Sequence, residues 1–420
     1  MRIFAILLVL GLVFGAGFFL LSPQQVIEIG PALKKVAPAG AGVVVPEVPE
    51  AESLKNDVTD STKILKTNGD IPNQARLASP PEVVKAIYAT GWSAGSVNRM
   101  DALIKMIDET ELNAIVIDIK DYSGFISYYI DDPLIVQSGA LKELRISKIN
   151  NLVKKLHDKN IYIIGRISVF QDPILAKAHP ECAIKSSKTG DVWRDRKGLA
   201  WMDPASEGVW NYDLAIAKDA LERGFDEVNF DYVRFPSDGE LGSMSYPFWK
   251  KDIPMEDVIE NFFKYLRLNL PQAKISADLF GLVTSAKDDL GIGQVFEKAL
   301  PYFDYIMPMV YPSHYASGAM GFKNPAEHPY EVVKNAIAEA NKRLMEYNTS
   351  QIDGLSSSTV AIHPRSEAKI RPWLQDFDLG TTYTAEMIRE QIKASDESGG
   401  SGWSLWDPKN IYTESALLKN

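Results

Sequence analysis

Two aspartates stand at the ends of neighbouring apolar runs, where paired carboxyl groups could do chemistry. Asp231 ends the alternating run EVNFD, and Asp278 lies in the run KISADLFG. Two carboxyl groups that flank a glycosidic bond can hydrolyse it, at a separation of about 5 Å for retention or about 6.5–9.5 Å for inversion. We therefore predict that Asp231 is the nucleophile or base and that Asp278 is the acid. The direction of the two side chains decides between retention and inversion.

Each aspartate also has a structural interpretation. Asp231 could simply neutralise Arg166 or Arg234 inside a buried rim, because an unpaired buried charge is costly. Asp278 could cap the turn or helix that follows it. These alternatives remain open at the level of the sequence.

Other charged residues end further apolar runs. The run NAIVIDIK carries Asp118 and Lys120 at its end, and Arg166 has the matching parity in IYIIGRISVF. We expect these three residues and Arg234 to contact substrate. Asp121 either orients substrate or makes a turn, and its neighbours favour the turn.

Aromatic residues follow the same run ends or lie in long loops. An aromatic face suits the apolar face of a pyranose, so several such residues at one rim favour a sugar-binding cleft, whereas each alone is more often part of a core. His314 could hydrogen-bond a sugar hydroxyl or serve as a structural donor. The aromatic set comprises Trp92, Trp201, Tyr232, Tyr311, Tyr315, Trp373, Trp403 and Trp406.

These residues are carried by eight β-rich runs that alternate with amphipathic segments of helical spacing. Such an alternation predicts an α/β fold, a (β/α)8 TIM barrel. The sixth and seventh runs are the least regular, and VAIHPR is an alternative strand there. The eight runs are 86–92, 113–120, 161–170, 227–235, 274–281, 305–312, 370–377 and 402–408.

Alternation within the runs assigns each side chain to one face of the barrel. Val228 and Phe230 should face the helices, which turns Asn229 and Asp231 inward. The same parity turns Asp278 inward on the next run. Barrel enzymes assemble their sites at the carboxyl ends of the strands, so we expect the charged residues to meet there.

The first 81 residues differ from the rest in composition. Residues 3–21 are apolar or glycine and follow Arg2. A run of this length can just span a bilayer, so residues 1–22 are a signal anchor or, if cleaved, a signal peptide. Residues 23–81 resemble a low-complexity linker. We expect residues 82–420 to form the barrel domain outside the cytoplasm, attached to the membrane by the N-terminal segment.

The net charge of -10 and the scattered acidic residues argue against nucleic acid as a partner. The single cysteine excludes an internal disulfide, and no Cys/His cluster indicates a metal site. We expect no metal or other cofactor. The remaining partner class is an oligosaccharide or polysaccharide.

The ordered motifs from Ala86 to Thr413 resemble a bacterial family called putative glycosyl hydrolase, formerly a domain of unknown function. The motifs are GWSAGS, VIDIKD, GFDEVNFDYVRFPSD, ADLFG, GIGQ, PMVYPSHY, RPWLQDF and LWDP. The resemblance implies a TIM-barrel glycosidase. Its fourth run is similar to the chitinase pattern DGxDxDxE, but Asn229 and Val233 replace two of the acids. This departure removes the usual chitinase proton donor.

The positions of Asp231 and Asp278 resemble an amylase-like arrangement, with a nucleophile after the fourth strand and an acid after the fifth. Asp376, after the seventh, is a competing nucleophile, because many barrel glycosidases use strands four and seven.

The sequence thus predicts an exported glycoside hydrolase that acts on an envelope or extracellular polysaccharide. A catalytically silent glycan-binding barrel is the main alternative. A deacetylase or another hydrolase is a weaker one, because neither a metal set nor a nucleophile elbow is seen.

Overall fold

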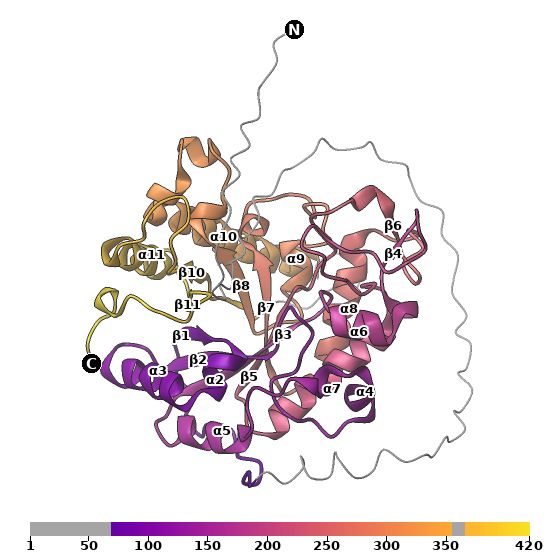
Figure 1. Ribbon diagram of the computed structural model, residues 1–420. Coiled ribbons are helices and arrows are strands. Elements are labelled where there is room, and N and C mark those ends of the chain that lie inside the picture. The colour runs from indigo at the N-terminus through magenta and orange to yellow at the C-terminus, as the bar shows by residue number, and fades with distance from the viewer. Residues whose placement is uncertain (1–68, 355–365) are drawn as a thin grey trace, which may run out of the picture.

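The computed structural model describes residues 69–354 and 366–420, which fold as a closed parallel barrel surrounded by helices (Figure 1). The strands follow one another around the barrel in chain order, and β10 closes it by pairing with both β8 and β11. The predicted (β/α)8 fold is therefore confirmed. The barrel strands are β1 (Val84–Ala89), β2 (Ala114–Lys120), β3 (Tyr162–Ser168), β5 (Glu227–Asp231), β7 (Lys274–Phe280), β8 (Tyr305–Val310), β9 (Lys369–Ile370), β10 (Trp373–Gln375) and β11 (Gly402–Trp406).

The seventh barrel position is shared by β9 and β10, with Arg371 and Pro372 between them. Proline has no backbone N–H for a strand ladder, which explains why this run is interrupted. The alternative strand VAIHPR, residues 360–365, lies outside the described residues.

Helices surround the strands, and α10 packs beside α11 near β10 and β11 (Figure 1). A two-stranded antiparallel ribbon of β4 (Lys185–Ser186) and β6 (Met244–Ser245) joins the loops that follow β3 and β5. The helices are α2 (Gly91–Gly95), α3 (Val97–Glu109), α4 (Pro133–Ser138), α5 (Ile149–His157), α6 (Pro173–Ala178), α7 (Glu207–Glu222), α8 (Met255–Asn269), α9 (Phe296–Ala299), α10 (Pro329–Gly354) and α11 (Ala385–Glu397).

Alternation along the strands divides the apolar residues into two cores. Val228 and Phe230 belong to the large core between strands and helices, as predicted. A smaller cluster that includes Val116, Ile164 and Met307 fills the inside of the barrel. The inward-facing positions are thus apolar inside the barrel and polar at the carboxyl ends of the strands.

Lys120 departs from this parity. The β2–β3 register shifts between Asp118 and Lys120, so that Lys120 pairs with the outward residue Ile167. A bulge of this kind turns the following side chain to the other face. The Lys120 Nζ lies 2.8 Å from Asp172 and 2.6 Å from Asp213, and all three side chains are fully buried. The predicted substrate contact of Lys120 does not fit this position.

The segment before β1 packs against the barrel. Asp70 accepts hydrogen bonds from the backbone N–H groups of Asn150 and Asn151 in the first turn of α5, and Leu77 N donates to Asp226 Oδ1 at 2.7 Å. These residues belong to the range 23–81 that we expected to be a linker, so its final part contacts the domain. The boundary at residue 82 stays a prediction.

Among the helices of the described residues, none is long and apolar enough to cross a membrane. The expected signal anchor or signal peptide over residues 1–22 lies outside those residues.

Replacement of Lys120 tests its structural role. Lys120→Met should lower the free energy of unfolding by roughly 3–5 kcal/mol, because it leaves two buried carboxyl groups without their cation. Lys154→Met is a matched control, since the Lys154–Asp158 pair is half-exposed and should contribute at most about 1 kcal/mol. Urea unfolding of both variants measures the difference. Equal, small losses would contradict the structural role of Lys120.

Candidate active site

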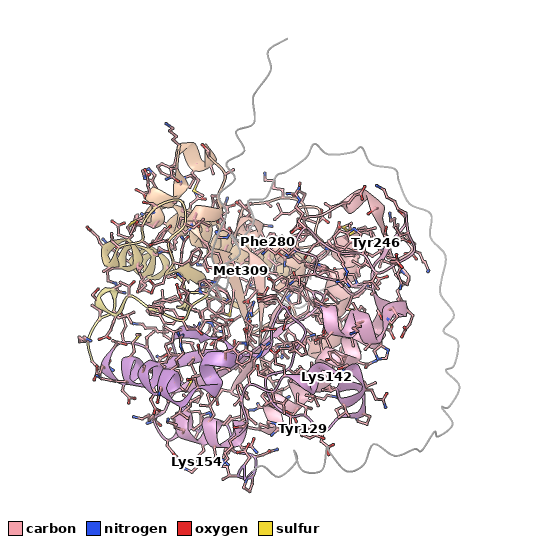
Figure 2. All side chains as sticks on the ribbon, in the orientation of Figure 1. Tyr129, Lys142, Lys154, Tyr246, Phe280 and Met309 are labelled. Atoms are coloured by element: carbon pink, nitrogen blue, oxygen red, sulfur yellow. The ribbon has the colours of Figure 1, made fainter. Side chains whose placement is uncertain are left out.

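A cavity of about 150 Å³ opens at the carboxyl ends of the barrel strands. Phe280 and Met309, which pair between β7 and β8, mark part of its wall (Figure 2). The cavity combines charged and aromatic side chains. Its lining residues are Arg166, Gln171, Asp195, Lys197, Asp231, Tyr232, Arg234, Ser237, Asp238, Asp278, Phe280, Gly281, Leu282, Met309, Tyr311, His314, Tyr315, Trp373 and Trp406.

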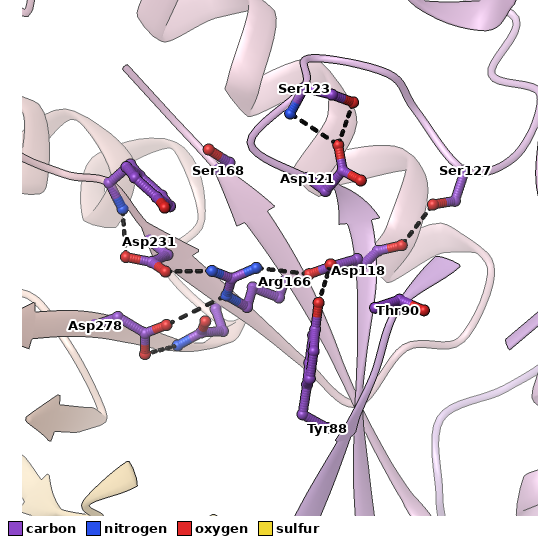
Figure 3. Close-up of polar contacts among 12 residues, drawn as sticks. Tyr88, Thr90, Asp118, Asp121, Ser123, Ser127, Arg166, Ser168, Asp231 and Asp278 are labelled. Atoms are coloured by element: carbon purple, nitrogen blue, oxygen red, sulfur yellow. Dashed lines mark hydrogen bonds and ion pairs between the residues drawn. The ribbon is translucent and has the colours of Figure 1, made fainter. Parts of the chain in front are cut away.

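The guanidinium of Arg166 on β3 joins three aspartates from three other strands (Figure 3). Its Nη1 donates to Asp118 Oδ1 at 2.7 Å and its Nη2 donates to Asp231 Oδ2. Its Nε lies 3.5 Å from Asp278 Oδ2, an ion-pair contact without a hydrogen bond. One positive charge therefore stands among three buried carboxyl groups.

Asp118 supports this cluster from outside the cavity lining. Its Oδ2 accepts a hydrogen bond from the Tyr88 hydroxyl, and its Oδ1 contacts Arg166 (Figure 3). Burial raises the pKa of Asp118 to about 6, although the charge of Arg166 opposes this rise. Asp118 thus positions Arg166 and is not placed to touch a ligand in the cavity.

Asp278 is the most deeply held of the cavity carboxyl groups. Its Oδ1 accepts hydrogen bonds from Asn229 Nδ2 at 2.8 Å and from Trp373 Nε1 at 2.7 Å. Burial, and next the charge of Asp231, raises the pKa of Asp278 to about 8, against the opposing charge of Arg166. At neutral pH this carboxyl group therefore carries a proton. Because Oδ1 accepts two N–H donors, the proton belongs on Oδ2.

Asp231 is held by a different set of donors. Its Oδ2 accepts from Arg166, and its Oδ1 accepts from the backbone N–H of Tyr232 at 2.5 Å. Tyr232 adopts a positive φ of 54°, which is uncommon for a bulky residue and is a form of strain found at functional sites. This backbone turn ends the strand alternation and brings Tyr232 into the cavity wall.

Aromatic side chains form one wall of the cavity. Trp406 stacks on Tyr88 with ring centroids 4.0 Å apart, and Trp373 meets Trp406 edge-on at 5.5 Å. Arg166 lies over the Trp406 ring at 5.1 Å. The wall therefore fixes the cation of the carboxylate cluster and offers an indole surface to a ligand.

His314 lines the cavity and carries an unpaired hydrogen-bond acceptor. Ser313 Oγ donates to Gln375 Oε1 at 2.9 Å, so it must accept from His314 Nδ1 at 3.0 Å. The Nε2 atom is then unprotonated, and it is buried without a partner among the described residues. Burial lowers the pKa of His314 to about 4. A neutral imidazole of this kind can accept a hydrogen bond from a sugar hydroxyl.

Two further predicted site residues lie away from the cavity. Trp403 is fully buried in the core between strands and helices, because its parity on β11 is outward. Asp376 accepts hydrogen bonds from the Thr413 backbone N–H and hydroxyl at 2.9 and 2.8 Å and so fixes the C-terminal segment. Neither the substrate contact predicted for Trp403 nor a nucleophilic role for Asp376 fits these positions.

The remaining sequence candidates fall around the rim. Asp121 accepts from Ser123 N at 2.9 Å, which is the turn interpretation. Trp92 is exposed outside the cavity and Trp201 is buried behind it. By contrast, the structure brings together Arg166, Tyr232, Arg234, Tyr311, His314, Trp373 and Trp406 with Asp231 and Asp278.

Sequence reasoning missed the loop that follows β3. Asp195 and Lys197 reach the cavity from this loop. Their signal was the polar and aromatic density of VWRDRKGLAW, which belongs to no strand. Tyr88 was also missed, although its inward parity on the first run could have identified it.

No group of three or more His, Cys, Asp or Glu side chains within residues 69–354 and 366–420 is arranged to hold a metal ion. The clustered aspartates surround a guanidinium instead.

Comparison with known proteins gives a family and a fold. Residues 86–412 match the family described as "Putative glycosyl hydrolase domain". No curated protein matches the chain.

Among solved structures, a hypothetical protein from Ruminiclostridium thermocellum is 39% identical, with 46% of this chain and 96% of that chain covered and a TM-score of 0.42. The PgaB (BpsB) glycoside hydrolase domain from Bordetella bronchiseptica is 12% identical, with 81% and 99% covered and a TM-score of 0.55. This second likeness supports the barrel fold.

The raised pKa of Asp278 makes stability depend on pH. An unfolded aspartate has a pKa of about 3.9, whereas the native one is raised to about 8. The native state therefore keeps a proton that the unfolded state loses. This contribution to stability is full below about pH 4 and is lost as the pH rises through about 8, by at most about 1.4 kcal/mol per pH unit.

Asp278→Asn should remove this dependence, so its stability relative to the wild type should be higher at pH 8 than at pH 5. Urea unfolding at several pH values measures this change, with the exposed Asp158→Asn as control. Parallel curves for the wild type and Asp278→Asn would show that Asp278 is ionised in the native protein.

Proposed function

Because the chain belongs to the putative glycosyl hydrolase family that its residues 86–412 match, we propose that it hydrolyses glycosidic bonds with Asp231 and Asp278 as its two carboxyl groups. The observation that carries this proposal is the shared guanidinium of Arg166. One cation among three buried carboxyl groups favours a state in which one of them stays protonated. Glycoside hydrolysis needs such a division between an acid and a carboxylate.

Asp278 is the general acid in this mechanism. Its burial raises its pKa to about 8, so it holds a proton at neutral pH and can give it to the leaving oxygen. Asn229 and Trp373 both donate to Oδ1, which fixes the orientation of the carboxyl group. The same two N–H groups stabilise the carboxylate that forms when the proton leaves.

Asp231 is the nucleophile or the base. It lines the same cavity, and the donors from Arg166 and from the Tyr232 backbone fix its direction. As positive charge develops at the anomeric carbon, the carboxylate of Asp231 stabilises it or bonds to it. Asp118 keeps Arg166 in place during this step.

The substrate we propose is an oligosaccharide or polysaccharide of the cell envelope or its surroundings. Trp406, which is partly exposed, offers an aromatic surface for a sugar ring, with the buried Trp373 and Tyr311 behind it in the cavity lining, and His314 offers an acceptor for a hydroxyl. The extracytoplasmic location, with attachment to the membrane, rests on the apolar run of residues 3–21.

A silent glycan-binding barrel is the second candidate, and one observation favours it. Asp231 pairs with Arg166, as it would if its role were only to neutralise that charge. In that case its loss should damage folding, and glycan binding only as far as folding is lost.

The comparison of Asp231→Asn with Asp118→Asn separates the two candidates. Both variants remove one carboxylate partner of Arg166, but only Asp231 lines the cavity. Both should lose similar stability, up to roughly 3–5 kcal/mol. Asp231→Asn should lose most turnover, by a factor of at least about 10³, whereas Asp118→Asn should lose far less.

The measurements are thermal unfolding and turnover on a substrate found by screening a glycan panel. A folded Asp231→Asn protein with a near-normal rate would refute the role of Asp231. No hydrolysis of any glycan that the protein binds would favour the silent barrel.

The acid role of Asp278 predicts a pH profile. The value of kcat/KM should fall about tenfold per pH unit above about pH 8, because the acid must be protonated. Asp278→Asn should lose this alkaline limb and should retain activity on aryl glycosides, whose good leaving groups need little protonation. Equal loss on natural and aryl substrates would assign the acid to another residue.

A further inference from the structure

Arg234 lies in the cavity wall within a cage of aromatic rings. Its guanidinium carbon is 4.8 Å from the Trp201 and Phe280 ring centroids and 5.4 Å from that of Tyr232. The residue is only 6% exposed, yet it lines the cavity that contains Asp231. The rings desolvate the cation and hold it at a fixed place in the cavity wall.

The hydrogen bonds of Arg234 leave one edge of its guanidinium free. Nη1 donates to Phe235 O at 3.0 Å and to Ser237 Oγ at 3.2 Å. Nε and Nη2 have no protein acceptor within the described part of the chain. These two nitrogens form the side edge of the guanidinium, whose parallel N–H bonds match the two oxygens of a carboxylate.

Arg234 also differs from the other cations buried at the barrel. Arg166, Lys120 and Arg371 each contact at least one carboxylate. Arg234 contacts none within 4.0 Å over residues 69–354 and 366–420. A buried cation without a contacting carboxylate is costly, and burial lowers the pKa of Arg234, although the more distant charges of Asp231, Asp238 and Asp195 oppose this shift.

The nearest loop carboxylates are committed to other groups. Asp195 accepts from the Lys197 and Leu199 backbone N–H groups and from Trp201 Nε1. Asp238 accepts from the Arg196 backbone N–H at 2.9 Å. These contacts hold the loop that follows β3 and leave the free edge of Arg234 to the cavity.

We propose that the Nε and Nη2 edge of Arg234 binds a carboxylate of the substrate, so that the glycan cleaved here contains an acidic sugar. This inference rests on the proposed function and narrows its substrate class. Lys197, an exposed lysine on the cavity lining, adds a second positive charge for the same group. The carboxylate belongs either to a uronic acid ring or to a lactyl ether substituent.

The test measures binding, without turnover, in an Asp278→Asn background. The probes are acidic glycans, each paired with its carboxyl-reduced form: a glucuronate polymer, a galacturonate polymer, and peptide-free glycan strands with lactyl carboxylates. At least one acidic probe should bind tenfold or more tightly than its reduced form, which is about 1.4 kcal/mol. The acidic probe that binds more tightly than its reduced form identifies the source of the carboxylate.

Variants assign the preference to Arg234. Arg234→Gln should abolish it, and Arg234→Lys should keep part of it, because a lysine retains the charge without the fork. Arg194→Gln is the control, since it removes a cation from the neighbouring loop that does not line the cavity. It should leave the preference unchanged.

Two results would overturn the inference: no acidic probe binds more tightly than its reduced form, or Arg234→Gln retains the preference. Either one, together with hydrolysis of a neutral glycan by the wild type, would leave the proposed function intact. Charge-selective binding that depends on Arg234, without hydrolysis by the wild type, would uphold the acidic ligand and contradict the hydrolase.

Discussion

The site depends on one buried guanidinium that serves three carboxyl groups. Arg166 contacts Asp118, Asp231 and Asp278, which come from three different strands, and it is itself buried against Trp406. Because a single cation cannot neutralise three carboxylates, the site is most stable with a proton on one of them. Asp278 has the raised pKa of about 8, and it is also the carboxyl group that Asn229 and Trp373 orient.

Hydrogen bonds inside the barrel connect this cluster to a second buried ion pair. Asn229 also donates to Ser276 Oγ, and Ser276 donates to Glu227 at 2.6 Å. Glu227 pairs with Arg371, and both side chains are fully buried. A column of hydrogen bonds thus runs along the barrel from the Glu227–Arg371 pair to Asp278. Strand ends, rather than mobile loops, therefore hold the carboxyl groups, and the site is preorganised by the same contacts that stabilise the barrel.

The sequence was sufficient for the fold and for the centre of the site. The alternation of side chains along apolar strands correctly predicted that Asp231, Asp278 and Arg166 face inward. These polar groups are tolerated inside the barrel because they pair with one another. The prediction from sequence failed at Lys120, where a bulge invisible in the sequence reverses the face. It also failed at Trp403, which lies at the start of β11 and has the outward parity of Leu405.

The loops explain the other differences. Asp195 and Lys197 reach the cavity through a long irregular connection, whose course depends on contacts that no periodicity encodes. Asp376 follows a barrel strand but is captured by Thr413, thirty-seven residues later. Arg234 was predicted to contact substrate, with pairing to Asp231 as the alternative, and its free edge became apparent only from the hydrogen bonds of the folded protein.

The division of protons among the three aspartates is the central claim, and carboxyl-selective ¹³C NMR titration of the ligand-free protein tests it directly. One aspartate resonance should titrate near pH 8 and disappear in Asp278→Asn. In Arg166→Lys the lysine keeps one positive charge among the three aspartates. It lacks the planar guanidinium that contacts all three carboxyl groups from fixed directions. A spectrum in which every aspartate has titrated below pH 6 would contradict the claim, because no carboxyl group would then hold the proton that the chemistry needs.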